Sequence, residues 1–146
     1  MPSFHFAFVG HKTSDPLFLV LDDYCQRLSH YAKLKTQWLK ENPDEIEKNF
    51  MARPSGELKI VLDEKGDEWS TAEWTRVLEK WQHQGIKNIS FWVGGSSGHS
   101  HTMKKQATKI VSLAKITLPH RLAAVVLVEQ VYRVHTILRG EPYHRN

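Results

Sequence analysis

The chain has 146 residues, of which 40% are hydrophobic and 25% charged, and this composition excludes disordered and collagen-like proteins. Such a length predicts a single domain, residues 1–146, with one hydrophobic core. The formal net charge of +4 favours a polyanionic partner, although 20 basic against 16 acidic residues is only a mild asymmetry.

Cysteine content and hydropathy indicate the compartment. Cys25 is the only cysteine, so an internal disulfide framework and a thiolate zinc cluster are excluded, and a reducing environment is expected. No apolar run reaches the roughly 20 residues that a membrane-spanning helix needs, and the first ten residues are too polar for a secretory signal. A cytoplasmic protein is therefore expected.

The first half of the chain alternates strand and helix patterns. Asp15 and Pro16 are typical of a helix start, and Ser70 and Glu73 have the spacing of a capping box. The predicted elements are a strand over residues 4–8, a helix over 17–31, a strand over 33–39, a short helix around 44–50 in a polar connection, a strand over 58–62 with a turn at 63–66, and a helix over 71–84.

The second half continues this alternation. Pro119 and Gly140 are typical of the start and the end of a helix. The predicted elements are a strand over residues 89–93, a glycine loop over 94–98, a helix over 99–109, a strand over 111–118, a helix over 120–138 and a tail over 141–146.

Alternating strands and helices predict an α/β fold with a mostly parallel sheet and helices on both faces. In such sheets ligands bind beyond the carboxyl ends of the strands. The residues that follow Leu62, Val93 and Leu118 are therefore the candidates for a binding site.

The glycine loop at residues 94–98 lets backbone approach a ligand closely, because glycine has no side chain. Its N–H groups could hold a carboxylate or a phosphate. The loop matches neither the dinucleotide-binding fingerprint nor a P-loop, so a tight structural turn is an equal alternative.

The last predicted helix is apolar around most of its circumference. Such a helix either lies at the centre of a core or packs against a second subunit, and the breadth of the apolar face favours a dimer interface. A helix wholly inside one core is the alternative.

Several polar residues near the end of the chain are candidates for RNA contact. Tyr143 and His144 could stack on an unpaired base while Arg145 holds phosphate, although a frayed polar end has the same composition. His120 either contacts substrate or fills the helix entry, and Arg133 has the spacing of an ion pair with Glu129. His99 and His101 lack a third ligand of clear spacing, so no metal site is expected.

Three segments, VGGSSG at residues 93–98, LAKITLPH at 113–120 and VLVEQVYRVHTILRGEPYHRN at 126–146, together resemble the ribosomal RNA large-subunit methyltransferase H family of the SPOUT superfamily. LDEKG at 62–66 and the FVG ending of the first strand extend this resemblance over nearly the whole chain. It implies a carboxyl-terminal trefoil knot, a homodimer, and S-adenosylmethionine-dependent methylation of N3 of a pseudouridine in a 23S rRNA stem-loop of the assembled ribosome.

The resemblance also implies site residues. The S-adenosylmethionine contacts fall on Leu62, Gly94, Gly95, Leu113, Ala114, Lys115, Ile116, Thr117 and Leu118. The substrate side and the catalytic residues fall on His120, Arg133, Tyr143, His144 and Arg145. Tyr143 or His144 could accept or relay the proton of N3, while Arg133 or Arg145 stabilises the resulting anion or holds a phosphate.

Two regions depart from the family pattern. Ser96, Ser97 and His99 stand where many relatives have a bulkier or acidic residue and a leucine, and the connection between Leu39 and Leu58 is shorter.

Two rival functions stay open: a noncatalytic RNA-binding module and a methyltransferase with another RNA target. A Rossmann-type nucleotide enzyme ranks last, because Gly10, His11 and Lys12 form no phosphate loop after the first strand.

Overall fold

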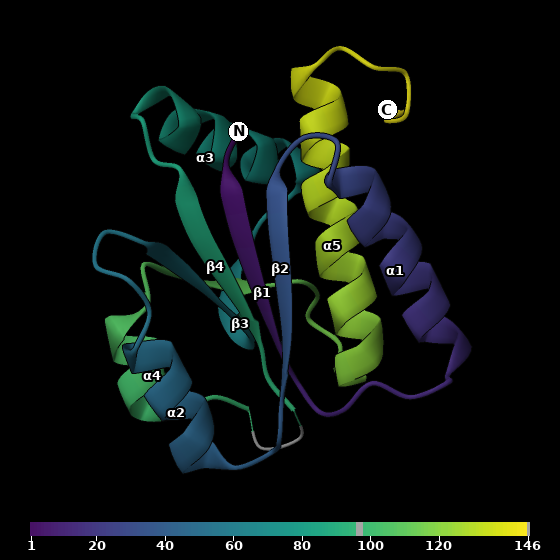
Figure 1. Ribbon diagram of the computed structural model, residues 1–146. Coiled ribbons are helices and arrows are strands. Elements are labelled where there is room, and N and C mark those ends of the chain that lie inside the picture. The colour runs from purple at the N-terminus through teal and green to yellow at the C-terminus, as the bar shows by residue number, and fades with distance from the viewer. Residues whose placement is uncertain (96–97, 146) are drawn as a thin grey trace.

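Figure 1 shows the computed structural model of the chain, which describes residues 1–95 and 98–145. Within these residues one five-stranded sheet has the order β2-β1-β4-β3-β5, and every neighbouring pair is parallel. The sheet confirms the predicted fold class. Its strands are β1 (Ser3–Val9), β2 (Lys33–Leu39), β3 (Leu58–Glu68), β4 (Asn88–Val93) and β5 (Lys109–Ser112).

Helices cover both faces of the sheet, as predicted (Figure 1). On one face α5 lies between α1 and α3, and it also contacts β1 and β4. The opposite face carries α2 and α4, which contact each other. The helices are α1 (Pro16–Leu28), α2 (Pro43–Met51), α3 (Thr71–His83), α4 (His101–Gln106) and α5 (His120–Leu138).

Successive side chains of β1 point to opposite faces of the sheet, and the core has one cluster on each face. Phe4, Phe6 and Phe8 are buried in the cluster under α1, α3 and α5. Ala7 and Val9 point to the other face and join the cluster under α2 and α4. Burial on both faces of the sheet explains why the central strands are almost wholly apolar.

Side-chain caps define where the helices begin. The Asp15 carboxylate accepts a 2.8 Å hydrogen bond from the backbone N–H of Leu17 and starts α1. The capping box of Ser70 and Glu73 is formed at the start of α3, as predicted. Gly140, with φ of 68°, follows the end of α5.

Two predicted helices are shorter in the structure. The helix predicted over 17–31 ends at Leu28, because Tyr31 bonds to Leu28 through the backbone in a turn that leads into β2. The helix predicted over 99–109 covers only His101–Gln106. There Ser100 caps the backbone N–H of Met103, and Thr108 already bonds to Lys59 of β3.

Two predicted strands were wrong in extent. β3 continues to Glu68 instead of stopping at Leu62, because its pairing with β5 shifts between Leu62 and Asp67 and residues 63–66 form a large bulge. The strand predicted over 111–118 stops at Ser112, the last residue that pairs with β3. Residues 113–119 leave the sheet as an irregular segment.

No helix in the described part of the chain is long and apolar enough to cross a membrane. The trefoil knot implied by the resemblance stays a prediction.

Candidate active site

A cleft of about 510 Å³ opens at the bulge of β3 and the end of β4. The bulge of β3, the glycine loop, the segment after β5 and the start of α5 form its walls. The lining residues are Leu62, Asp63, Glu64, Lys65, Val93, Gly94, Gly95, Gly98, Lys104, Leu113, Ala114, Ile116, Thr117, Leu118, Pro119, His120 and Ala123. The cleft therefore lies at the carboxyl ends of parallel strands, where the sequence places the site.

The bulge of β3 depends on Gly66. A Cβ atom at this residue would lie 2.7 Å from the backbone carbonyl of Ile110 in β5, closer than real Cβ atoms come. The absence of a side chain lets the bulge fold against β5 and turn Asp63 and Glu64 toward the cleft. Glycine here serves close backbone packing.

Asp63 is ionised at the floor of the bulge. Burial would raise the pKa of its carboxyl, but a 2.8 Å ion pair with Lys104 and a hydrogen bond from the backbone N–H of Lys65 outweigh burial and lower that pKa. The cleft therefore contains a fixed negative charge and, on α4, its positive partner.

The segment over residues 113–119 forms the outer wall of the cleft. Thr117 donates a 2.9 Å hydrogen bond from its hydroxyl to the Glu64 carboxylate. Lys115 does not line the cleft, unlike the other predicted donor contacts in this segment; its Nζ donates to the carbonyl oxygen of Gly66 at 2.9 Å. The wall is thus attached to the bulge. Ile116 is 70% exposed and offers an apolar surface at the rim.

Gly94 and Gly95 both line the cleft. Their small size also serves packing, since a Cβ atom at Gly95 would come within 2.6 Å of the Glu41 carboxylate. Ser96 and Ser97 lie outside the described residues.

His99 is buried beneath the glycine loop. Its Nε2 lies 2.9 Å from the carbonyl oxygen of Trp92, and burial lowers the pKa of the imidazole. In the described part of the chain no three His, Cys, Asp or Glu side chains are grouped to hold a metal ion.

His120 lies in the cleft at the first turn of α5. A Cβ atom at Gly10, whose φ is 127°, would lie 2.9 Å from the His120 Nε2, so Gly10 makes room for this ring. Next to it, Arg121 forms a 2.9 Å ion pair with Asp15 and joins α5 to the start of α1.

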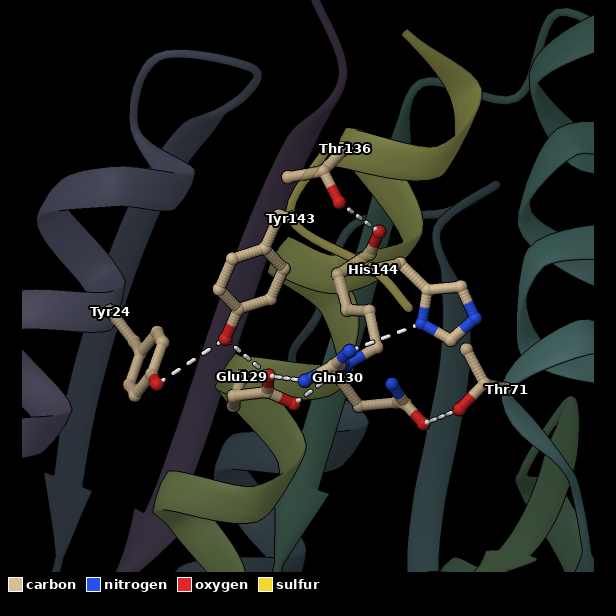
Figure 2. A network of polar contacts seen from close by, with 8 residues as sticks. Tyr24, Thr71, Glu129, Gln130, Thr136, Tyr143 and His144 are labelled. Carbon is tan, nitrogen blue, oxygen red and sulfur yellow. Dashed lines mark hydrogen bonds and ion pairs between the residues drawn. The ribbon is translucent and has the colours of Figure 1, made fainter. Parts of the chain in front are cut away.

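The other predicted catalytic residues lie at the opposite end of α5. Arg133 is 13 residues after His120, which is roughly 20 Å along a helix. The tail folds back on α5 there, so that Tyr143 and His144 both contact residues of this helix (Figure 2). Arg145 follows them and is exposed.

The structure therefore forms two separate groups. His120 joins the predicted donor residues in the cleft, whereas Arg133, Tyr143 and His144 form a second cluster with Glu129. Sequence reasoning does not single out Lys104, since only the packing of α4 brings it to Asp63. The position of Asp63 directly after the predicted strand was a usable signal.

Comparisons with known proteins agree on one family. The family model described as "Predicted SPOUT methyltransferase" matches residues 3–144. A ribosomal RNA large subunit methyltransferase H from Polynucleobacter asymbioticus is 37% identical over 94% of this chain and 95% of its own. A relative of the same name from Thermus thermophilus is 36% identical over 87% of both chains.

A solved structure shares the fold. The crystal structure of a probable rRNA-methyltransferase from Porphyromonas gingivalis superposes with a TM-score of 0.57 at 10% identity, covering 94% of this chain and 70% of that one. With a family model that matches almost the whole length and relatives above 30% identity, the chain belongs to the SPOUT methyltransferases, among the ribosomal RNA large subunit methyltransferase H proteins.

Proposed function

We propose that this protein transfers a methyl group from S-adenosylmethionine to N3 of a pseudouridine in 23S rRNA of the assembled ribosome. The relatives that are similar over 87–94% of this chain are named for ribosomal RNA methylation. The observation that carries the proposal is the cleft at the bulge of β3 and the end of β4, which gathers all but one of the expected donor contacts.

The residues of the cleft fit such a donor. A cleft of about 510 Å³ is within the size range of small-ligand sites. Leu62, Leu113 and Leu118 supply apolar walls for a purine ring, and Gly94 exposes backbone beside them. The Glu64 carboxylate, whose hydrogen-bond partner Thr117 is neutral, favours a ligand that carries positive charge. When bound, the donor supplies an electrophilic methyl group on a sulfonium.

The chain's contribution to the reaction is alignment of the nucleophilic nitrogen and stabilisation of the charge that forms on it. His120 is the predicted substrate residue inside the cleft. Arg133, Tyr143, His144 and Arg145 are proposed to hold the pyrimidine and its phosphates. Their place at the far end of α5 means that one chain does not bring them to its own cleft in this conformation.

We infer that the protein acts as a homodimer in which the tail of one chain completes the cleft of the other. Much of the apolar surface of α5 is already buried inside one chain, among it Val128 and Val131, so breadth of the apolar face alone does not require a partner. A half-buried stripe remains on one side of α5. It consists of Leu122, Val126, Glu129, Arg133 and Ile137, at helical spacing. A second α5 is its proposed partner.

The test is methyl transfer from isotopically labelled S-adenosylmethionine to ribosomes from cells that lack this gene, followed by mass mapping of the rRNA. The expected product is one labelled 3-methylpseudouridine in 23S rRNA. Label on another RNA would assign a different target. A folded protein that binds no S-adenosylmethionine in calorimetry would overturn the enzyme assignment and favour an RNA-binding module.

A further inference from the structure

Glu129 is the centre of the contacts that hold the tail (Figure 2). Its carboxylate accepts a 2.7 Å hydrogen bond from Nη2 of Arg133 and a 2.6 Å hydrogen bond from the hydroxyl of Tyr143. The Glu129 and Arg133 side chains are 21% and 27% exposed, so water screens this ion pair only in part. One carboxylate thus contacts both a helix residue and a tail residue.

The direction of the Tyr143 hydrogen bond follows from the chemistry of its partner. An ionised carboxylate only accepts hydrogen bonds, so the Tyr143 hydroxyl directs its proton to Glu129. Tyr24 lies 3.3 Å away, hydroxyl to hydroxyl, on the other side. Burial and the Glu129 carboxylate raise the pKa of Tyr143, which keeps the phenol protonated. Tyr143 is therefore poorly suited to accept a proton.

The chemistry of the partner also shows which ring nitrogen of His144 carries the proton. Nη1 of Arg133 lies 3.1 Å from Nδ1 of the His144 ring. A guanidinium only donates, so Nδ1 accepts and the neutral ring carries its proton on Nε2. Nε2 is then a hydrogen-bond donor and has no lone pair with which to accept a proton.

Ring contacts fix the orientation of the tail. The guanidinium of Arg133 lies 4.7 Å from the centroid of the Tyr143 ring, and Tyr132 packs edge-on against that ring at 4.8 Å. Because Arg133 is itself held by Glu129, the positions of both tail rings depend on this one carboxylate.

We propose that Glu129 is a positioning residue for methyl transfer: it holds Arg133 and the Tyr143 hydroxyl, and thereby sets the orientation in which the tail presents its positive charge to an anion. This inference rests on the proposed function. It replaces the alternative that Tyr143 or His144 accepts the N3 proton: that proton leaves to solvent water, and the tail stabilises the resulting pyrimidine anion or holds a phosphate beside it.

The matched pair of variants is Glu129→Gln and Asp23→Asn. Glu129→Gln keeps the shape of the side chain and removes its charge. Asp23→Asn does the same in another i,i+4 pair with arginine, Asp23 with Arg27, which is exposed on α1 and forms no hydrogen bond or ion pair with the tail residues that the structure describes. In steady-state assays with ribosomes we expect Glu129→Gln to lower kcat/KM at least about tenfold, because small misplacements cost that much. Asp23→Asn should match the wild type, and both should keep the wild-type Kd for S-adenosylmethionine.

A double-mutant cycle separates positioning from general damage. If Glu129 acts through Tyr143, Glu129→Gln and Tyr143→Phe together should cost less than the product of the single effects. Effects that multiply, or a Glu129→Gln variant with wild-type kcat/KM, would overturn the inference.

A spectroscopic readout keeps this inference distinct from the proposed function. Nitrogen-15 NMR of labelled histidine should show His144 protonated on Nε2 in the wild type and as mixed tautomers in Glu129→Gln. If the wild type transfers no methyl group, the proposed function fails, and the NMR result still decides what Glu129 does. A His144 that is protonated on Nδ1 in the wild type contradicts the inference.

Discussion

The Lys115 ammonium lies 2.9 Å from the carbonyl oxygen of Gly66 and joins the two sides of the candidate cleft. It also lies 3.4 Å from the carbonyl oxygen of Glu64. The outer wall over residues 113–119 has no ladder partner beyond Ser112, so this contact and that of Thr117 with Glu64 hold it against the bulge of β3. Lys115 therefore shapes the wall of the candidate cleft, and its predicted contact with the donor stays a prediction.

Lys115→Ala should weaken donor binding without removing it. Loss of the contacts to the bulge leaves the wall less ordered, at a cost of about 1 kcal/mol, which corresponds to about fivefold in Kd. Calorimetry with S-adenosylmethionine measures this change. Lys105→Ala, which removes an exposed lysine from α4, is the matched control and should bind as the wild type does. Equal Kd values for the two variants would show that Lys115 does not shape the cleft.

Gly66→Ala should destabilise the fold through steric overlap. The new methyl group would press on the β5 backbone at Ile110 and Val111, and overpacking of this kind costs about 2 kcal/mol. Gly56→Ala serves as a comparison, because its Cβ meets nothing within 4 Å and only its φ of 88° is strained, at a cost of about 1 kcal/mol. Urea denaturation gives both values. A harmless Gly66→Ala would mean that the bulge can move away from β5.

The strands and helices of the sheet show which features local sequence patterns predict well and which features they miss. Apolar alternation located β1, an apolar run located β4, and the capping box of Ser70 and Glu73 located α3, because these signals are local. The bulge over residues 63–66 and the early end of β5 depend on a register shift between two distant strands, which no local pattern reports. Element boundaries at the cleft were therefore the least accurate.

Some features of the candidate site could likewise be predicted from the sequence, and others depend on tertiary packing. The predicted strand ends gave the location of the cleft, and the family resemblance gave most of the residues that line the cleft. Both kinds of signal lie in short stretches of sequence. The ion pair of Lys104 with Asp63 joins residues about 40 positions apart in the sequence, and only tertiary packing reveals it. The separation of His120 from Tyr143 likewise follows from the path of the tail back along α5.

Acid should destabilise the fold through its buried histidines. Burial lowers the pKa of His99 and of His135 below the ordinary value of 6.5, so below that pH the unfolded chain binds protons that the folded chain excludes. With both imidazoles neutral, above about pH 6.5, the free energy of unfolding is not reduced by these histidines. It decreases as the pH falls from there toward their folded-state pKa values.

The free energy of unfolding should therefore be smaller at about pH 5.5 than at about pH 7.5, by on the order of 1 kcal/mol for each of these histidines. His135→Phe should reduce this difference, because the residue packs among Phe4 and Tyr31 and a neutral ring suits that site. Urea titrations at the two pH values test it. An unchanged difference in His135→Phe would assign the acid sensitivity to other groups.

The central claim, that the cleft of one chain works with the tail of its partner, is tested most directly by mixing two inactive variants. Ala114→Trp fills the cleft and leaves the tail intact, whereas the double variant His144→Ala/Arg145→Ala keeps the cleft and loses the tail. In a re-equilibrated equal mixture about half of the dimers are mixed, and each has one intact cleft facing one intact tail. The account predicts that methyl transfer to ribosomes recovers to about a quarter of the wild-type rate. Mixed dimers that are seen by native mass spectrometry and yet transfer no methyl group would contradict it.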